Sequence, residues 1–454
     1  MYTDLSFKEA EEYIIGVHVL KKHRINVYCI TKPTRIMLSK VFKSGTFTTL
    51  LFFLYILCQG QKIASFELTL QKPAFGIEIP VSVNLDEVTY LPDTLLNLVE
   101  VQGKNRINIP FQIDQGINRT LYWMVKAGAS QGEKHIYELV REAPVVHEEV
   151  TASFNDGALT IHKGTRNLLQ YYFKTVYPPA GVDTAYKRSG FIHPLWSPNG
   201  QVLTRIQPPD HYHHYGIWNP WTQVEYEGEK VDFWNINSKQ GTVRFANFVF
   251  VENGPVFSEF GAVHEHVVLK KEGGEKTALN ELHNVRVFSP QEKQPFFIVD
   301  FNFTLNCATD SPFKILEYRY AGIGWRTTEK WDNKNSMVLT SEGRSRKDAD
   351  GSKARWCIVQ GQIDDDYAGV VMMSFPTNYN FPEPLRIWPE NQYNRGDMFA
   401  NFCPTKDRDW LLTPKKNYVL KYRFLVFNGQ IDKDKAESAW YYFANPPEVT
   451  VRKF

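Results

Sequence analysis

The segment PDHYHHYG, residues 209–216, brings an aspartate together with three of the chain's 12 histidines. Imidazole exchanges protons near neutral pH and is also the commonest metal ligand among side chains. Three interpretations follow: an acid–base site, a metal site, or a tight loop whose side chains only hydrogen-bond one another. Because an aspartate accompanies several histidines here, we favour a functional site over the loop alone.

The acid–base interpretation needs the fewest additional residues. Asp210 would orient or activate His211 or His213, which could then donate or accept a proton without further tuning. His193, in FIHPLW, is predicted to assist as an acid, and Glu317 is the predicted partner carboxylate. Cleavage of a glycosidic bond by two carboxylates is the alternative, with Glu317 and Glu390 as the pair.

The metal interpretation needs a third ligand from outside the segment. If the segment is extended, His211 and His213 project to one side, so at most two of its histidines face one ion. A catalytic zinc ion takes three protein ligands and a water molecule. His193 is the predicted third ligand, with the segment VHEHVV at 263–268 as another source. A divalent metal ion therefore remains a candidate cofactor.

Tryptophans bracket the cluster, and further polar residues follow it downstream. Flat aromatic faces beside polar groups suit sugars, because the C–H faces of a sugar ring pack on π-systems while its hydroxyls form hydrogen bonds. Arginines would hold an anionic or hydroxyl-rich ligand. The predicted ligand contacts are Trp218, Trp221, His214, Arg326, Arg386 and Trp388.

Alternation of apolar and polar residues with a period of two dominates the sequence. IVDFNFTLNC, residues 298–307, and YVLKYRFLVFNG, residues 418–429, each place their apolar residues on one face. Asp432 or Asp434 is expected to cap one short helix, which ends at Asn445 and two prolines. We predict an all-β protein: a large antiparallel β-sandwich with a small N-terminal β-domain and a short C-terminal helix.

The chain of 454 residues is longer than one hydrophobic core usually supports, so two domains are expected. Residues 61–145 have the size of a small β-sandwich. Residues 150–454 hold enough strands for a large β-sandwich that carries the histidine cluster. The predicted boundary is the segment APVVHEEVTASFNDG at 143–157.

Residues 1–60 are predicted to be an N-terminal extension followed by a cleaved signal peptide. Lysines precede TTLLFFLYIL, an apolar run of about ten residues that is typical of a secretory signal and too short to span a bilayer. Met37 is the expected true start, and Gln61 the first residue after cleavage. The protein is therefore expected to be periplasmic or secreted, with a lipoprotein anchor on Cys58 as the alternative.

Charge and motifs narrow the classes of partner. The formal net charge is +2, which does not indicate the basic surface of a nucleic-acid-binding protein. The sequence contains no Gly-rich nucleotide-binding motif. The exported part has no apolar run of the roughly 20 residues needed to span a membrane. The oligomeric state is left open.

The segment RSGFIHPLWSPNGQVLTRIQPPDHYHHYGIW, residues 188–218, resembles the family labelled "methane oxygenase PmoA". The resemblance extends over about residues 65–430, with Tyr215 at a position where the family pattern more often has arginine. It implies an exported bacterial β-sandwich protein of glycan degradation, related in architecture to galactose-mutarotase-like sandwiches. A membrane-bound methane-oxidising subunit would need several apolar spans, which this chain lacks.

We therefore expect a carbohydrate-active enzyme, a lyase, hydrolase or epimerase that works by proton transfer with or without a metal ion. One alternative is a non-catalytic glycan-binding protein, for which the aromatic residues suffice. A metal-dependent oxygenase, as the family label suggests, is the third.

Overall fold

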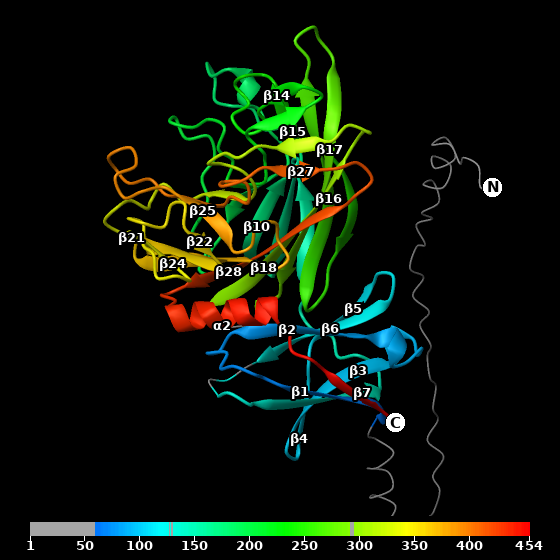
Figure 1. Ribbon diagram of the computed structural model, residues 1–454. Helices are drawn as coiled ribbons and strands as arrows, with labels where there is room; N and C mark the ends of the chain where they lie inside the picture. Colours follow the sequence, from blue (N-terminus) through cyan, green and yellow to red (C-terminus); the bar gives the residue numbers. More distant parts are fainter. Residues whose placement is uncertain (1–59, 127, 129, 291–294) are drawn as a thin grey trace, which may run out of the picture. The chain divides into compact units, whose positions relative to one another are not determined.

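The computed structural model describes residues 60–126, 128, 130–290 and 295–454, and Gly60–Phe454 form one compact unit. The predicted start at Met37, the signal peptide and Cys58 lie outside the described residues. Antiparallel sheets account for nearly all of the regular structure (Figure 1). The predicted all-β sandwich is therefore confirmed.

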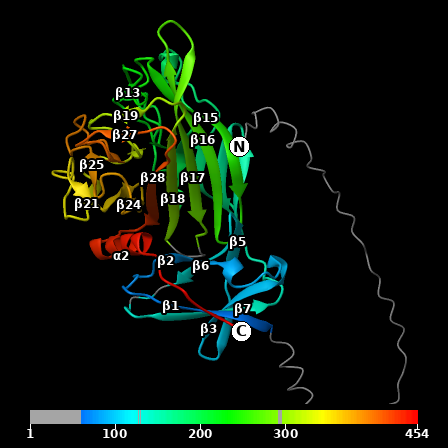
Figure 2. The same cartoon turned by 45° about the vertical axis from the view of Figure 1, so that its right-hand side comes forward.

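Two large sheets form the main β-sandwich (Figure 2). In spatial order, the eight-stranded sheet consists of β15 (Gly241–Glu252), β16 (Phe257–Leu269), β17 (Glu275–Phe288), β18 (Phe296–Cys307), β28 (Tyr418–Asn428), β24 (Asp366–Ser374), β23 (Trp356–Ile363) and β21 (Ser336–Thr340). The nine-stranded sheet consists of β22 (Lys353–Ala354), β25 (Glu383–Ile387), β26 (Phe399–Phe402), β20 (Gly324–Arg326), β12 (Ile217–Trp218), β11 (Phe191–Leu195), β10 (Arg166–Tyr172), β9 (Ala158–Lys163) and β8 (Val150–Asn155).

The main hydrophobic core lies between these two sheets. Leu169 and Ile192 project into it from the nine-stranded sheet, and Val299, Phe301 and Phe303 project from β18. Alternate residues of β18 are thus buried on one face, as its sequence predicts. A small four-stranded sheet adds β14 (Glu229–Val231), β13 (Val224–Tyr226), β19 (Phe313–Ile315) and β27 (Trp410–Leu412).

The N-terminal region has two smaller sheets and its own core. The five-stranded sheet is β29 (Thr450–Lys453), β1 (Gln61–Thr69), β7 (Lys134–Arg141), β3 (Leu96–Gln102) and β4 (Asn105–Asn108); the three-stranded sheet is β2 (Glu78–Asn84), β6 (Arg119–Lys126) and β5 (Phe111–Gln115). Phe66 stacks on Trp123 between these sheets, with ring centroids 5.7 Å apart. Because β29 pairs with β1, the end of the chain belongs to the N-terminal sheet.

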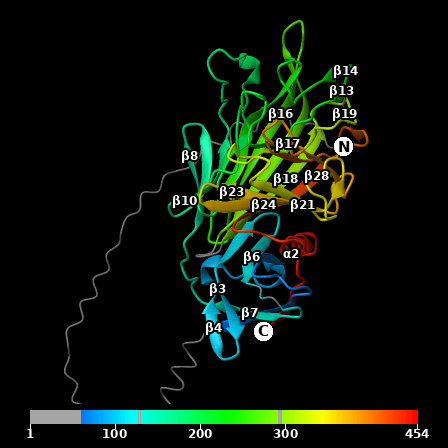
Figure 3. The same ribbon diagram turned by 90° about the vertical axis from the view of Figure 1, so that its left-hand side faces the viewer.

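Helix α2 (Lys433–Ala444) packs against both regions (Figure 3). The side chain of Asp432 caps it by accepting a hydrogen bond from the Lys435 amide at 2.9 Å, which confirms the predicted helix. Ala436 and Ala439 share a core cluster with Ile298 on the outer face of the eight-stranded sheet. Among the residues that the structure describes, no helix has the length and hydrophobicity to cross a membrane.

Candidate active site

The histidine segment is a double turn between β11 and β12. The Gln207 amide donates to the His214 carbonyl at 2.8 Å, the His211 amide to the Pro208 carbonyl at 2.8 Å, and the His214 amide to the His211 carbonyl at 3.0 Å. Gln207 has a φ of 46°, which turns the chain at the start of the loop. The segment is therefore not extended. The limit of two histidines facing one ion, which assumed an extended segment, does not apply.

The turns bring His211, His213 and His214 together. Ring centroids are 5.1 Å apart for His211 and His213, 4.6 Å for His211 and His214, and 4.7 Å for His213 and His214. One nitrogen of each ring lies within 4.8 Å of those of the other two. Three imidazoles from one loop are thus close enough to bind a common ligand.

Asp210, His211 and Tyr393 form a hydrogen-bonded chain. His211 Nδ1 lies 2.8 Å from Asp210 Oδ2, and His211 Nε2 lies 3.1 Å from the Tyr393 hydroxyl. An ionised carboxylate only accepts hydrogen bonds, so the neutral imidazole carries its proton on Nδ1. The lone pair on Nε2 therefore points toward Tyr393 and is available as a base.

Arg326 also binds Asp210, at the carboxylate oxygen that His211 contacts. Its Nη2 lies 3.2 Å from Asp210 Oδ2 and 2.6 Å from Asp397 Oδ2. Burial alone would raise the pKa of Asp210, but the hydrogen bond from His211 and the charge of Arg326 lower it to about 2. Asp210 is therefore ionised at any pH at which the protein would work.

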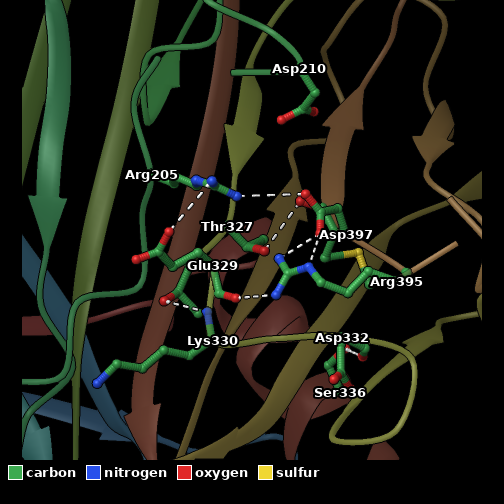
Figure 4. A network of polar contacts seen from close by, with 12 residues as sticks. Arg205, Asp210, Thr327, Glu329, Lys330, Asp332, Ser336, Arg395 and Asp397 are labelled. Atoms are coloured by element: carbon green, nitrogen blue, oxygen red, sulfur yellow. Dashed lines mark hydrogen bonds and ion pairs between the residues drawn. The ribbon is translucent and has the colours of Figure 1, made fainter. Parts of the chain in front are cut away.

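A network of ion pairs fixes Asp397 in turn. Asp397 lies between Arg205 and Arg395 (Figure 4), with Arg205 Nη1 at 3.6 Å and Arg395 Nε at 2.6 Å. Arg205 also pairs with Glu329 at 3.4 Å. This network, whose Arg326–Asp397 pair is buried and whose outer members Glu329 and Arg395 are exposed, anchors Arg326, and through it Asp210, to the ends of β20 and β26.

His213 and His214 are neutral. Burial, together with the nearby imidazole of His211 and the charge of Arg188, lowers the pKa of His213 to about 3. Burial and the neighbouring His213 lower the pKa of His214 well below its ordinary value. Neutral imidazole is the form that binds metal ions.

A cavity of about 320 Å³ opens beside the three histidines. It is lined by His211, His213, His214, Trp234, Asn235, Tyr318, Arg319, Tyr320, Arg386, Gln392 and Tyr393. Aromatic rings, amides and cations thus line it, and none of these described residues is acidic. The volume is at the lower end of what small-molecule sites have.

Two arginines and Tyr320 form one wall of this cavity. The guanidinium of Arg386 lies 4.9 Å from the centroid of the Tyr320 ring, and its Nη2 donates to the Tyr320 hydroxyl at 3.0 Å. Asp350 pairs with Arg386 at 2.9 Å. The guanidinium of Arg319 lies 5.6 Å from the centroid of the Tyr320 ring.

Two buried tryptophans pack against the rings of the histidine loop. The centroid of the Trp388 ring lies 5.1 Å from that of His211 and 5.6 Å from that of His214. The guanidinium of Arg326 lies 4.5 Å from the centroid of the Trp388 ring. Trp218 lies 5.1 Å from His214. Both tryptophans are almost fully buried, so they position the loop and do not present a face to a ligand.

Three predicted residues lie away from the cavity. His193 is held by Thr204, with 2.9 Å between its Nδ1 and the Thr204 hydroxyl, and it lines another hollow. Trp221 is 0% exposed in the main core and packs edge-on against Trp410. Glu317 is exposed, and its backbone amide donates a hydrogen bond to the Asp409 carboxylate. None of the three lines the cavity beside the three histidines, although His193 shares its hollow with Pro208 and Pro209 at the start of the loop.

Several residues of the site are absent from the sequence-based prediction. Tyr393 has a φ of 53°, a conformation that is rare for residues other than glycine and that directs its side chain at His211. Such backbone strain is often found at functional sites. Tyr320, Asn235 and Asp397 reach the site from three separate segments, and no local pattern distinguishes them.

The structure has two groups of side chains that could hold a metal ion within the described residues. The first is His211, His213 and His214 in the loop, with Asp210 behind His211. The second is His264, Glu281 and His283 inside the main sandwich. A metal-binding histidine typically donates its other ring N–H to a carboxylate, as His211 does to Asp210.

The model of a family of unknown function, DUF6807, matches residues 158–441 of the chain. The match includes the eight-stranded sheet, every strand of the nine-stranded sheet except β8, and every residue of the cavity. It does not carry the methane oxygenase description, so that resemblance stays a prediction. No curated protein matches the chain.

Proposed function

This chain belongs to DUF6807, a family of unknown function, and we propose that it is an exported carbohydrate-active enzyme that transfers a proton at His211. The observation that carries the proposal is the hydrogen-bonded chain from Asp210 through His211 to Tyr393 at the edge of a polar, aromatic cavity. Asp210 fixes the tautomer, which leaves Nε2 to exchange a proton with a bound sugar.

The lining of the cavity favours a sugar that carries an anionic group. Arg319 and Arg386 supply permanent positive charge, and a guanidinium binds a carboxylate through paired hydrogen bonds. Asn235 and Gln392 offer amides to sugar hydroxyls, and Tyr318 and Tyr320 offer ring faces. A uronic acid residue combines these features, so we propose uronate-containing glycans as the substrate class.

Each side chain then has a separate task. Arg319 and Arg386 bind the carboxylate of the sugar and fix its distance from the loop. His211 removes a proton from the sugar or gives one to a leaving oxygen, and Tyr393 can pass that proton on through its hydroxyl. Abstraction of a proton next to a carboxylate is the first step of both elimination and epimerisation, and protonation of the leaving oxygen is a step of hydrolysis.

A divalent metal centre is the second candidate, because three neutral imidazoles converge within 4.8 Å. His211, His213 and His214 would hold the ion, and a bound ion would polarise a sugar oxygen or a water molecule. The residues fit such an ion, since Asp210 supplies the supporting hydrogen bond to His211. Metal analysis of the loop variants distinguishes this candidate from metal-free proton transfer.

A glycan screen tests the proposal. Purified protein is incubated with matched neutral and uronate-containing oligosaccharides, products are detected by mass spectrometry, and binding is followed by the melting temperature. We expect products from uronate glycans, and a loss of at least about 100-fold in His211→Gln, the contribution typical of a general acid or base. His162→Gln, in β9 away from the cavity, is the matched control.

Two outcomes would contradict the proposal in different ways. A glycan that stabilises the protein without being converted would make this a glycan-binding protein. Equal turnover by wild type and His211→Gln would remove the loop from the chemistry.

A further inference from the structure

A second polar cluster lies inside the main sandwich, away from the histidine loop. His264 and His266 alternate along β16, and Glu281 and His283 alternate along β17. His264 pairs directly with Glu281 across the two strands. Residues two apart on a strand share a face, so the four side chains point together toward the sandwich interior.

These side chains are removed from solvent. His264 is 2% exposed, Glu281 1% and His283 2%. One nitrogen of each of the two histidines and one oxygen of Glu281 lie within 4.8 Å of one another. A buried carboxylate between imidazoles is costly unless a positive charge compensates it.

The hydrogen bonds around Glu281 and His264 resemble those that support metal ligands. Glu281 Oε1 lies 3.1 Å from His264 Nδ1, while its Oε2 lies 3.1 Å from His266 Nε2 and 3.0 Å from Asn219 Nδ2. The hydroxyl oxygen of Tyr171 lies 2.6 Å from His264 Nε2. His264 and Glu281 thus each have an outer partner that fixes their orientation, as ligands of metal ions do.

His283 is the unexplained member of this cluster. Both of its ring nitrogens are buried and have no hydrogen-bond partner among the described residues. Its ring stacks on Phe303, with centroids 4.5 Å apart, so the packing holds it in place. A buried polar group without a partner destabilises the folded state, and native structures contain few of them. One nitrogen of His283 also belongs to the group of converging ligand atoms.

We propose that His264, Glu281 and His283 bind a divalent transition-metal ion as a structural site inside the sandwich. Two imidazoles and one carboxylate are typical ligands of zinc, and a bound ion would provide the missing partner of His283. Tetrahedral zinc holds its ligand atoms roughly 3.4 Å apart. His264 Nδ1 and Glu281 Oε1 already lie 3.1 Å apart, so the nitrogen of His283, within 4.8 Å of the other ligand atoms, is the one that must approach. The ion would also compensate the buried charge of Glu281.

The site would stabilise the sheet beneath the cavity. Asn219, which donates to Glu281, follows Trp218 in the chain, and Trp218 packs on His214. Because the three ligands are buried, the ion would enter during folding and leave slowly. This inference does not depend on the proposed catalytic role of His211.

Metal content after refolding tests the inference. The protein is unfolded with a chelator and refolded with zinc(II) alone or without metal. We expect one bound zinc per chain that persists when His211, His213 and His214 are all replaced by alanine. His283→Phe and Glu281→Gln should lose this zinc, whereas the control His135→Gln, in β7 of the N-terminal region, should keep it.

The melting temperature of the wild type provides a measurement that needs no variant. Zinc-refolded protein should melt at least about 2 °C above the metal-free protein, a shift that corresponds to roughly 2 kcal/mol in a chain of this size. Zinc retained at wild-type level by His283→Phe would overturn the inference. So would wild-type protein that binds no zinc on refolding and melts at the same temperature with or without it.

Discussion

Glu383 provides a pH-dependent test of the packing of the main sandwich. This residue, in β25, is 0% exposed. Burial raises its pKa from 4.5 to about 7, against hydrogen bonds from Ser374, Asn378 and Tyr422 that would lower it. The folded protein therefore keeps the carboxyl protonated over a pH range in which the unfolded chain has already released the proton.

The sign of the effect follows from this difference. Below pH 4.5 the carboxyl is protonated in both states, so the free energy of unfolding is not affected. Between pH 4.5 and about 7 the unfolded chain loses its proton first, and stability falls. The total loss is about 3 kcal/mol, because each pKa unit corresponds to about 1.4 kcal/mol.

Glu383→Gln should remove this loss, since the amide imitates the neutral acid in shape: its carbonyl can accept from Ser374 and Asn378, and its NH2 group takes the place of the acid O–H beside the Tyr422 hydroxyl. Urea unfolding of both proteins at pH 5, 6, 7 and 8 gives the difference in unfolding free energy at each pH. We expect that difference to shift in favour of the variant by about 2.5 kcal/mol from pH 5 to pH 8, because part of the loss has already occurred at pH 5. Glu272→Gln, on an exposed turn, is the matched control. A difference that stays constant with pH would refute the reasoning.

Three further predictions concern the site and its support. Trp221→Ala should lower the free energy of unfolding by about 3–5 kcal/mol, because the ring is fully buried; a loss of glycan affinity at unchanged stability would contradict this. Arg326→Met should cost about 3–5 kcal/mol in urea unfolding, because it leaves Asp397 buried with weaker pairing; an unchanged midpoint would contradict it. Asp210→Asn should lower kcat about 100-fold with Kd nearly constant, whereas the exposed control Asp364→Asn should not.

The strands and the helix follow closely from local sequence. Val299, Phe301 and Phe303 are buried together because a strand repeats every two residues, and Asp432 caps α2 because its carboxylate accepts from the first turn. The second buried face was not predictable in this way. Ile298 is covered by α2, a contact between segments more than 120 residues apart that no local period encodes.

The site was predictable only where its residues are adjacent in sequence. Asp210 and the three histidines stand out in the sequence by their residue types. Their convergence depends on a double turn, which the assumption of an extended segment did not predict. Trp388 and Arg386 were identified by residue type, and the pairing of β25, β26 and β20 brings them to the loop. The position of the Tyr393 side chain depends on a left-handed backbone conformation, which the local sequence does not predict.

The predicted role of Trp221 shows the limit of arguments from residue type. Tryptophan is as common in cores as at sugar-binding surfaces, and only burial distinguishes the two. Trp221 lies in the core, whereas Tyr318 and Tyr320 line the cavity. Aromatic residues near a polar loop therefore predicted the kind of site but not which rings form it.

A crystal structure of the Asp210→Asn variant with the uronate glycan that the screen identifies would test the central claim most directly. The account predicts that the sugar carboxylate lies against Arg319 and Arg386, and that a sugar oxygen or C–H group lies within about 3.5 Å of His211 Nε2, the reach that proton transfer requires. A glycan bound elsewhere on the chain, with the cavity beside His211 filled only by solvent, would contradict it.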